Sequence, residues 1–277
     1  MAREGLGPGV DRYGRLRWAF YCLASFVVRN LFWPNRLRVS GLENVPLTGP
    51  FIYAPNHVSY ADPPVAGAII ARRRHVNFMA KAGLFKIPVL APAISALGAF
   101  PVRRGAADRR AIRHAVKVLK DGQALMMYPE GTRAPDESAL LPGETGVAYV
   151  AALSGAPVIP VGLIGTDRLM PRGTPLFIPR RCEVRIGAPL PLPMLEGGNR
   201  SREALEQATY EIMAAIAELV GKPHPGVKGA KADGRGQAPA PGCVLVATSA
   251  GQPHPRSVAE PRTTPSPLAE RGNGTEP

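Results

Sequence analysis

Apolar and polar positions along the chain form a pattern that predicts strands and helices in alternation. Residues 37–40 and 51–54 are short apolar segments of strand type, separated by a turn region rich in Pro and Gly. Residues 106–120 carry apolar side chains at helical spacing, and Asp121-Gly122 ends that pattern. Strands alternating with helices predict an α/β fold with a mixed, partly parallel sheet flanked by helices. We expect further strands at 75–80, 124–128, 158–164 and 182–186, and further helices at 63–71, 147–153 and 203–220.

The two ends of the chain differ in composition from its middle and suggest three parts. Residues 221–277 contain no Phe, Tyr or Trp, and Pro and Gly recur every few residues. Such a segment cannot bury enough apolar surface to offset the entropy of ordering it, so we expect a disordered tail. Residues 38–220 then form the main domain, and residues 1–37 form an N-terminal helical segment.

The N-terminal segment has the composition of an interfacial helix. Its apolar run from Trp18 to Val28 is well short of the ~20 residues that cross a bilayer. Trp18, Tyr21 and Trp33 lie among arginines, as side chains do at the depth of lipid headgroups. A helix packed on the domain core is the alternative interpretation. We favour the interfacial one, which predicts a peripheral or monotopic protein on the cytoplasmic side of the cell membrane.

The charge of the chain narrows the choice of partners. A formal net charge of +13 suits nucleic acid, an anionic membrane surface or a phosphorylated substrate. No zinc finger, helix-turn-helix or aromatic RNA-binding motif is present, which argues against nucleic acid. The three cysteines are far apart and fit neither a disulfide framework nor a metal site. We therefore expect no metal.

The segment from Asn56 to Pro63 is the strongest local candidate for catalysis. It follows a predicted strand and precedes a predicted helix, so His57 lies in a loop at the end of a strand. Histidine can serve as a base near neutral pH, and Asp62 can accept the other ring N–H of His57. The same residues also fit a structural loop in which Asp62 caps the next helix. Ser59 is another possible cap for that helix.

A second candidate segment, Tyr128 to Arg133, also follows a predicted strand. Gly131 allows close approach of the backbone, and the planar guanidinium of Arg133 suits a phosphate. Glu130 could hold Arg133 or bind a substrate hydroxyl. Taken alone, this segment also fits an ordinary surface turn. Two further apolar segments, residues 97–104 and 155–161, carry little information by themselves.

The four segments in this order resemble the glycerolipid acyltransferase family, and specifically bacterial 1-acylglycerol-3-phosphate acyltransferases. The resemblance covers roughly residues 38 to 190 and implies that family's fold. Lys81 matches a basic position that the family keeps before the second block. The other matches are Asn56, His57 and Asp62 in the first block, Gly98 to Arg104 in the second, Glu130 to Arg133 in the third, and Val158 to Val161 in the fourth.

The resemblance implies direct transfer of a fatty acyl group to the free hydroxyl of 1-acylglycerol 3-phosphate, giving phosphatidic acid. The donor would be acyl-CoA or acyl carrier protein, with no cofactor. His57 would act as general base and Asp62 would orient it. A serine acyl-enzyme is disfavoured because no Gly-x-Ser-x-Gly turn is present. The resemblance assigns the acceptor phosphate to Lys81, Arg104 and Arg133, and the shape of the acceptor pocket to Glu130, Gly131 and Thr132.

The sequence departs from the family pattern at two positions. Arg103 stands where the family commonly has an acidic residue, and Glu144 lies near a place where it usually has Lys or Arg. Both differences bear on the choice of acceptor and donor. The alternatives are therefore an acyltransferase for glycerol 3-phosphate or another lysolipid, or a non-catalytic lipid-binding module. The intact His57–Asp62 pair argues against the module.

Overall fold

The computed structural model describes residues 37–71, 73–88, 90–103, 108–173 and 177–229, together with Leu23 and Phe26. Leu23 and Phe26 are helical and exposed, while the rest of the predicted interfacial segment lies outside the described residues. The predicted tail lies outside them from residue 230 onward. Within the described part, no helix combines the length and the apolar character that crossing a membrane requires.

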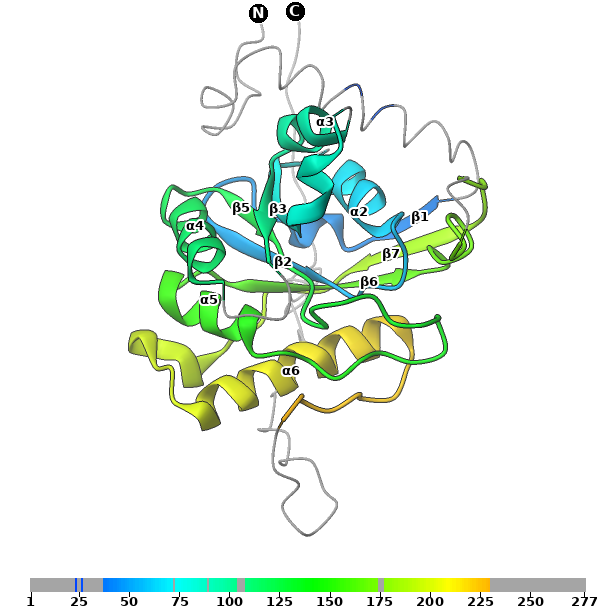
Figure 1. Cartoon of the computed structure of the whole chain (residues 1–277). Helices are drawn as coiled ribbons and strands as arrows, with labels where there is room; N and C mark the ends of the chain where they lie inside the picture. The colour runs from blue at the N-terminus through cyan, green and yellow to red at the C-terminus, as the bar shows by residue number, and fades with distance from the viewer. Residues whose placement is uncertain are drawn as a thin grey trace, which may run out of the picture. The chain divides into compact units, whose positions relative to one another are not determined.

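A seven-stranded sheet forms the centre of the fold, in the order β1-β7-β6-β2-β5-β3-β4 (Figure 1). All neighbouring strands pair in parallel except β6 and β7, which are antiparallel. The predicted α/β fold with a mixed, partly parallel sheet is thus confirmed. The strands are β1 (Leu37–Ser40), β2 (Phe51–Pro55), β3 (Val76–Lys81), β4 (Ala99–Val102), β5 (Ala124–Met126), β6 (Val158–Ile164) and β7 (Cys182–Ile186).

Helices cover both faces of this sheet (Figure 1). Buried residues of α4, α5 and α6 share one apolar cluster, and those of α2 share the other. Three 3-10 helices, η1 (Leu42–Asn44), η2 (Ala82–Lys86) and η3 (Pro193–Gly198), lie in the connections. The α-helices are α2 (Asp62–Ile70), α3 (Leu90–Ala96), α4 (Arg109–Lys120), α5 (Gly146–Ser154) and α6 (Arg202–Val220).

Strand β2 shows why the sheet is covered on both sides. Its side chains alternate between the two faces, because successive residues of a strand point in opposite directions. Ile52 and Ala54 belong to the cluster under α4, α5 and α6, whereas Phe51 and Tyr53 belong to the cluster under α2. A central strand buried on both faces must be apolar throughout, which matches its sequence. The strand is therefore a rigid base for the loop that follows it.

Strand β4 was not predicted from the sequence. Residues Ala99–Val102 lie at the edge of the sheet and pair with β3, with Pro101 opposite Ala80. The nearby Gly98 and Pro101 interrupted the apolar pattern and concealed the strand. An edge strand tolerates Pro because one side of its backbone needs no ladder hydrogen bond. The strand matters for the site, because it leads toward Arg103 and Arg104.

The segment Lys222–Gly229, which we call the strap, packs on the main domain. It turns back along α6, as Figure 1 shows in yellow-orange. The ring of His224 stacks on Tyr210 at 4.0 Å, and Arg202 donates a hydrogen bond to the carbonyl of Gly229. We had placed these residues in the disordered tail because they carry no Phe, Tyr or Trp. The tail stays a prediction only for residues 230–277.

Candidate active site

Two loops with predicted functional residues leave the sheet at the same edge. β2 leads into the loop with His57, and β5 leads into the loop with Glu130 and Arg133. The two strands are parallel neighbours, with Tyr53 opposite Met126. Since the carboxyl ends of parallel strands meet at one edge, the sheet brings these loops together. Open α/β sheets bind their ligands at this edge.

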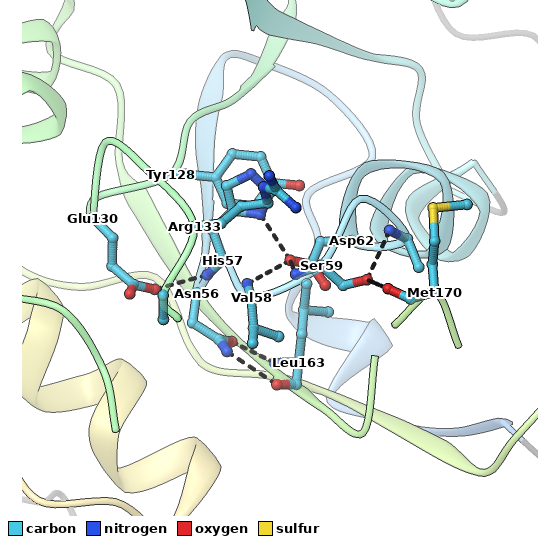
Figure 2. Close-up of polar contacts among 12 residues, drawn as sticks. Asn56, His57, Val58, Ser59, Asp62, Tyr128, Glu130, Arg133, Leu163 and Met170 are labelled. Carbon is cyan, nitrogen blue, oxygen red and sulfur yellow. Dashed lines mark hydrogen bonds and ion pairs between the residues drawn. The ribbon is translucent and has the colours of Figure 1, made fainter. Parts of the chain in front are cut away.

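His57 and Asp62 form a buried hydrogen-bonded pair (Figure 2). Nδ1 of His57 lies 2.7 Å from Oδ2 of Asp62, and both side chains are almost completely buried. Asp62 is the first residue of α2, so the helix holds its carboxylate at a fixed place beside the loop. When Nδ1 donates its hydrogen to the carboxylate, the lone pair of Nε2 is left to accept a proton. The contact between His57 and Asp62 that the spacing predicts is thus present, and its geometry suits a base and an orienting carboxylate.

The same carboxylate oxygen shapes the loop between the two residues. Oδ2 of Asp62 also accepts hydrogen bonds from the backbone N–H groups of Val58, at 2.7 Å, and Ser59, at 2.8 Å. The Ser59 hydroxyl accepts from the N–H of Ala61 and donates to the carbonyl of Met170. Ser59 is not a cap of α2, because the cap position is Ala61, without a side-chain cap bond. The suggested cap was wrong, and Ser59 instead ties the loop to the β6–β7 connection.

Tyr128 supports the imidazole of His57 from one face. The two rings are stacked, with centroids 4.0 Å apart and planes 23° apart. Burial raises the pKa of Tyr128 well above its ordinary value, and the charge of Asp62 raises it further. A neutral phenol ring therefore lies against the imidazole and restricts its rotation. The candidate segment Tyr128 to Arg133 included Tyr128, but the sequence pattern gave this residue no role.

Glu130 joins its own loop to the loop with His57. Its Oε1 accepts the backbone N–H of His57 at 2.7 Å, and its Oε2 accepts the N–H of Leu141 at 2.9 Å. The residue is only 2% exposed, and each of its two carboxylate oxygens accepts one backbone N–H. Burial raises the pKa of Glu130 to about 7, opposed by the hydrogen bonds from Leu141 and His57. These bonds fix the position of the two loops, and the predicted part of Glu130 in the acceptor pocket stays a prediction.

Arg133 lies over an exposed aromatic ring near the same edge. Its guanidinium carbon is 3.6 Å from the ring centroid of Tyr60, which is 59% exposed. Stacking leaves the edge of the planar guanidinium, with its N–H donors, available to a phosphate. Arg172 donates to the carbonyls of Arg133 and Ala134 and so holds this turn. Neither Tyr60 nor Arg172 was singled out in the sequence.

Gly131 and Thr132 form the exposed tip of the turn between Glu130 and Arg133. Gly131 has a φ of 65°, a left-handed conformation that favours glycine. A Cβ at this position would also lie 2.6 Å from a carboxylate oxygen of Glu144. The turn thus favours glycine for its conformation, and the carboxylate of Glu144 lies close against it. The exposure of both residues is compatible with the predicted contact to an acceptor.

The structure gives Lys81 a place at the edge of the sheet but no side-chain hydrogen-bond partner among the described residues, and it does not describe Arg104. Met126 of β5 pairs with Tyr53 of β2 on one side and with Phe78 of β3 on the other. Asn56 and Lys81 each follow three residues later, so they lie at the same level of the sheet. Two strand spacings separate the two, about 10 Å. Lys81 is exposed at the edge that carries His57.

Asn56 anchors the His57 loop to the neighbouring strand. Its side-chain amide donates to the carbonyl of Leu163 at 3.0 Å and accepts the N–H of the same residue at 2.6 Å. The amide thus continues the β2–β6 ladder for one more residue, as Figure 2 shows. The block contained Asn56, but only the strand order reveals its partner. Within the described residues no group of three or more His, Cys, Asp and Glu could hold a metal ion.

The titration of Glu130 generates a testable prediction. Its pKa is about 7 in the folded protein, against an ordinary value of 4.5. The group therefore favours the folded state below pH 4.5, and this contribution is lost as the pH rises through 7. Relative to Glu130→Gln, the wild type should lose stability across that interval, by about 1.4 kcal/mol for each unit of pKa difference. Urea unfolding at several pH values measures this, and parallel curves for the two proteins would contradict it.

The chain is similar to several known acyltransferases. Residues 36–164 match the sequence model of a family described as Acyltransferase. A 1-acyl-sn-glycerol-3-phosphate acyltransferase from the chloroplast of Brassica napus is 34% identical over 169 residues, which are 59% of this chain and 47% of that protein. A lyso-ornithine lipid O-acyltransferase from Pseudomonas aeruginosa is 30% identical over 232 residues, which are 77% of this chain and 84% of that protein. This chain thus spans about half of the plant relative and most of the bacterial one.

A solved structure shows the same fold. The crystal structure of the 1-acyl-sn-glycerophosphate acyltransferase from Thermotoga maritima matches with a TM-score of 0.58 and 30% identity, over 74% of this chain and 79% of that one. The match therefore extends beyond the four sequence blocks to the arrangement of sheet and helices. Together with the bacterial relative matched over most of its length, it shows that this chain belongs to the acyltransferase family, as the order of the four blocks predicted.

Proposed function

We propose that the protein transfers a fatty acyl group to the free hydroxyl of 1-acylglycerol 3-phosphate and so makes phosphatidic acid. The observation that carries this proposal is the buried His57–Asp62 pair at the carboxyl edge of the sheet. The family and the relatives named 1-acyl-sn-glycerol-3-phosphate acyltransferase support the same reaction. The donor is a thioester, acyl-CoA or acyl carrier protein.

In the proposed reaction, His57 accepts a proton through Nε2. The acceptor hydroxyl attacks the carbonyl carbon of the thioester, and its proton moves to His57. A C–O bond forms, the C–S bond breaks, and the proton then passes from His57 to the leaving thiolate. Asp62 holds the ring through Nδ1 and offsets the positive charge that develops on it. Tyr128 and Glu130 keep the ring and the backbone of His57 in place.

The acceptor phosphate is proposed to bind at Arg133, with Lys81 as a further cation at this edge. Arg104, which follows β4 in the sequence, stays a third candidate from the resemblance alone. Arg133 is held over Tyr60, and its turn is held by Arg172, so little side-chain freedom is left to lose on binding. A planar guanidinium can make two parallel hydrogen bonds to a phosphate. Gly131 and Thr132 form the adjoining exposed surface of the turn.

A second acceptor class has a specific observation in its favour. The relative matched over 77% of this chain is named for a lyso-ornithine lipid, whose headgroup is an amino acid. Such an acceptor presents a hydroxyl to the same base but lacks a phosphate for Arg133. A panel of acceptors distinguishes the classes: purified protein with labelled acyl-CoA or acyl carrier protein, against 1-acylglycerol 3-phosphate, glycerol 3-phosphate and lyso-ornithine lipid. Preference for an acceptor without phosphate would replace the first proposal.

Replacing the proposed base tests catalysis itself. His57→Ala should lower kcat by about 10²- to 10⁴-fold, because general base catalysis is worth that much. Asp62→Asn should also be severely impaired, since an amide cannot offset the charge on the imidazolium. His114→Ala, which changes an exposed histidine of α4, is the matched control and should retain activity. Transfer at near wild-type rate by His57→Ala would leave a lipid-binding module as the better description.

Replacing the proposed phosphate ligand tests acceptor binding. Arg133→Ala should raise KM for the lysolipid more than KM for the acyl donor, because a charged hydrogen bond to the phosphate is lost. Arg38→Ala is the control. It removes an exposed arginine of the edge strand β1, which three strands separate from β5, and it should change neither the KM for the lysolipid nor the KM for the acyl donor. A change confined to the donor constant would reassign Arg133 to the phosphates of CoA.

We further propose that the segment before Trp33 anchors the protein on the cytoplasmic side of the membrane. The support is its sequence, in which a short apolar run lies among arginines and Trp/Tyr. Each nearby Arg adds about 1 kcal/mol of attraction to anionic lipid, so binding should weaken with salt. Deletion of residues 1–33 should abolish flotation with anionic vesicles. Flotation that persists in this variant would place the anchor elsewhere.

A further inference from the structure

The strap is hydrogen-bonded to the loop that carries Glu130 and Arg133. The N–H of Gly143 donates to the carbonyl of Gly226, and the N–H of Lys228 donates to the carbonyl of Gly143. Gly143 and Val227 form a parallel bridge between the two segments. The ammonium group of Lys228 lies 2.6 Å from Oε1 of Glu144. The strap therefore adds a short piece of strand pairing, and one ion pair, to this loop.

From this contact a hydrogen-bonded path leads to the proposed base. The N–H of Glu144 donates to the carbonyl of Pro129 at 2.8 Å. The N–H of Leu141 donates to Glu130, and Glu130 accepts the N–H of His57. Residues 127–145 form no helix or strand, apart from the bridge at Gly143. Their conformation thus depends on such ties, together with those that Ala134 and Glu137 make in the middle of the loop.

The strap is itself fixed to α6. The Nδ1 of His224 accepts the N–H of Gly226, so its Nε2 carries the hydrogen that is donated to the carbonyl of Tyr210. Gly143 packs closely on the same helix, because a Cβ there would lie 2.6 Å from Met213 and 2.8 Å from Thr209. The loop is thus held between α6 and the strap, at a position where only glycine fits.

We propose that the strap is a positioning element of the active site. The ion pair between Lys228 and Glu144 holds the strap against the loop that carries Glu130. Neither residue touches the reacting atoms in this arrangement. They act through Gly143 and Glu130 on the backbone of His57. The effect on transfer rests on the proposed function, whereas the effect on the loop does not. Local hydrogen exchange therefore separates the two.

Three full-length variants at Lys228 remove the contacts step by step. Lys228→Arg keeps the ion pair and the backbone bond. Lys228→Ala removes the ion pair, which at this exposure shifts an opening equilibrium by about 1.5- to 5-fold. Lys228→Pro also removes the N–H that donates to Gly143, for a further change of about 2- to 10-fold. Lys117→Ala is the control, because Lys117 is as exposed as Lys228 and forms an ion pair with Asp121 at the end of α4.

Amide hydrogen exchange of residues 129–145 is the first measurement. Exchange should rise in the order Arg, Ala, Pro at position 228, with wild-type exchange in α2, in β6 and in the Lys117→Ala control. The midpoint of thermal unfolding should change little, since only one loop is released. Unchanged exchange of 129–145 in Lys228→Pro would overturn the proposal. So would an equal rise over the whole domain, which would mean general destabilisation.

Acyl transfer by the same variants is the second measurement. The kcat should fall in the order in which exchange rises, with Lys228→Arg near wild type. If exchange rises as expected while kcat is unchanged, the strap does not position the active site. If the wild type transfers no acyl group to any acceptor, the proposed function fails, while the exchange result still decides how the loop is held.

Discussion

Two backbone N–H groups from separate loops, those of His57 and Leu141, donate to the carboxylate of Glu130 at the edge of the sheet. The rest of the site depends on this interaction, which holds the loop with His57 against the loop with Arg133, together with the hydrogen bond from the N–H of Ala134 to the carbonyl of His57 at 2.7 Å. A carboxylate can serve two donors at once, and burial strengthens both bonds by lowering the local dielectric. The same burial disfavours the charge, which is why the pKa of Glu130 is raised to about 7. The two loops are thus held together by a buried carboxylate whose ionised form is less favourable in the folded protein than in the unfolded chain.

The sheet explains why such a tie is possible. β2 and β5 are parallel and adjacent, so their following loops start side by side, whereas α2 begins immediately after the first loop and presents Asp62 to it. Asp62 then organises its loop through one oxygen, with the imidazole and two N–H groups as donors. Ser59 and Arg172 add links from the β6–β7 connection to both loops. The backbone that carries His57, Asp62 and Arg133 is therefore itself held by hydrogen bonds.

The sequence predicted what is local. Apolar periodicity located all strands but β4, and the spacing of His57 and Asp62 predicted their contact. It could not predict which strands are neighbours, so the amide of Asn56 found its partner in Leu163 only in three dimensions. For the same reason it could not predict that Glu130 accepts the N–H of His57, which is 73 residues away along the chain. The strap was assigned to the tail because composition cannot reveal that His224 stacks on Tyr210.

Contacts between distant parts of the chain also explain the position of Glu144, where the sequence departs from the family pattern. Its carboxylate lies against the Gly131 turn, beside the surface proposed for a phosphate. An unpaired negative charge there would repel an anionic acceptor, and would weaken the attraction that Arg133 provides. Lys228 lies 2.6 Å away and offsets that charge, although it is 84 residues distant in sequence. The sequence alone shows an acidic residue, Glu144, near a place where the family usually has Lys or Arg. In the folded protein the ammonium group of Lys228, supplied by the strap, lies next to the Glu144 carboxylate. The net charge beside the Gly131 turn therefore depends on a residue near the end of the domain sequence.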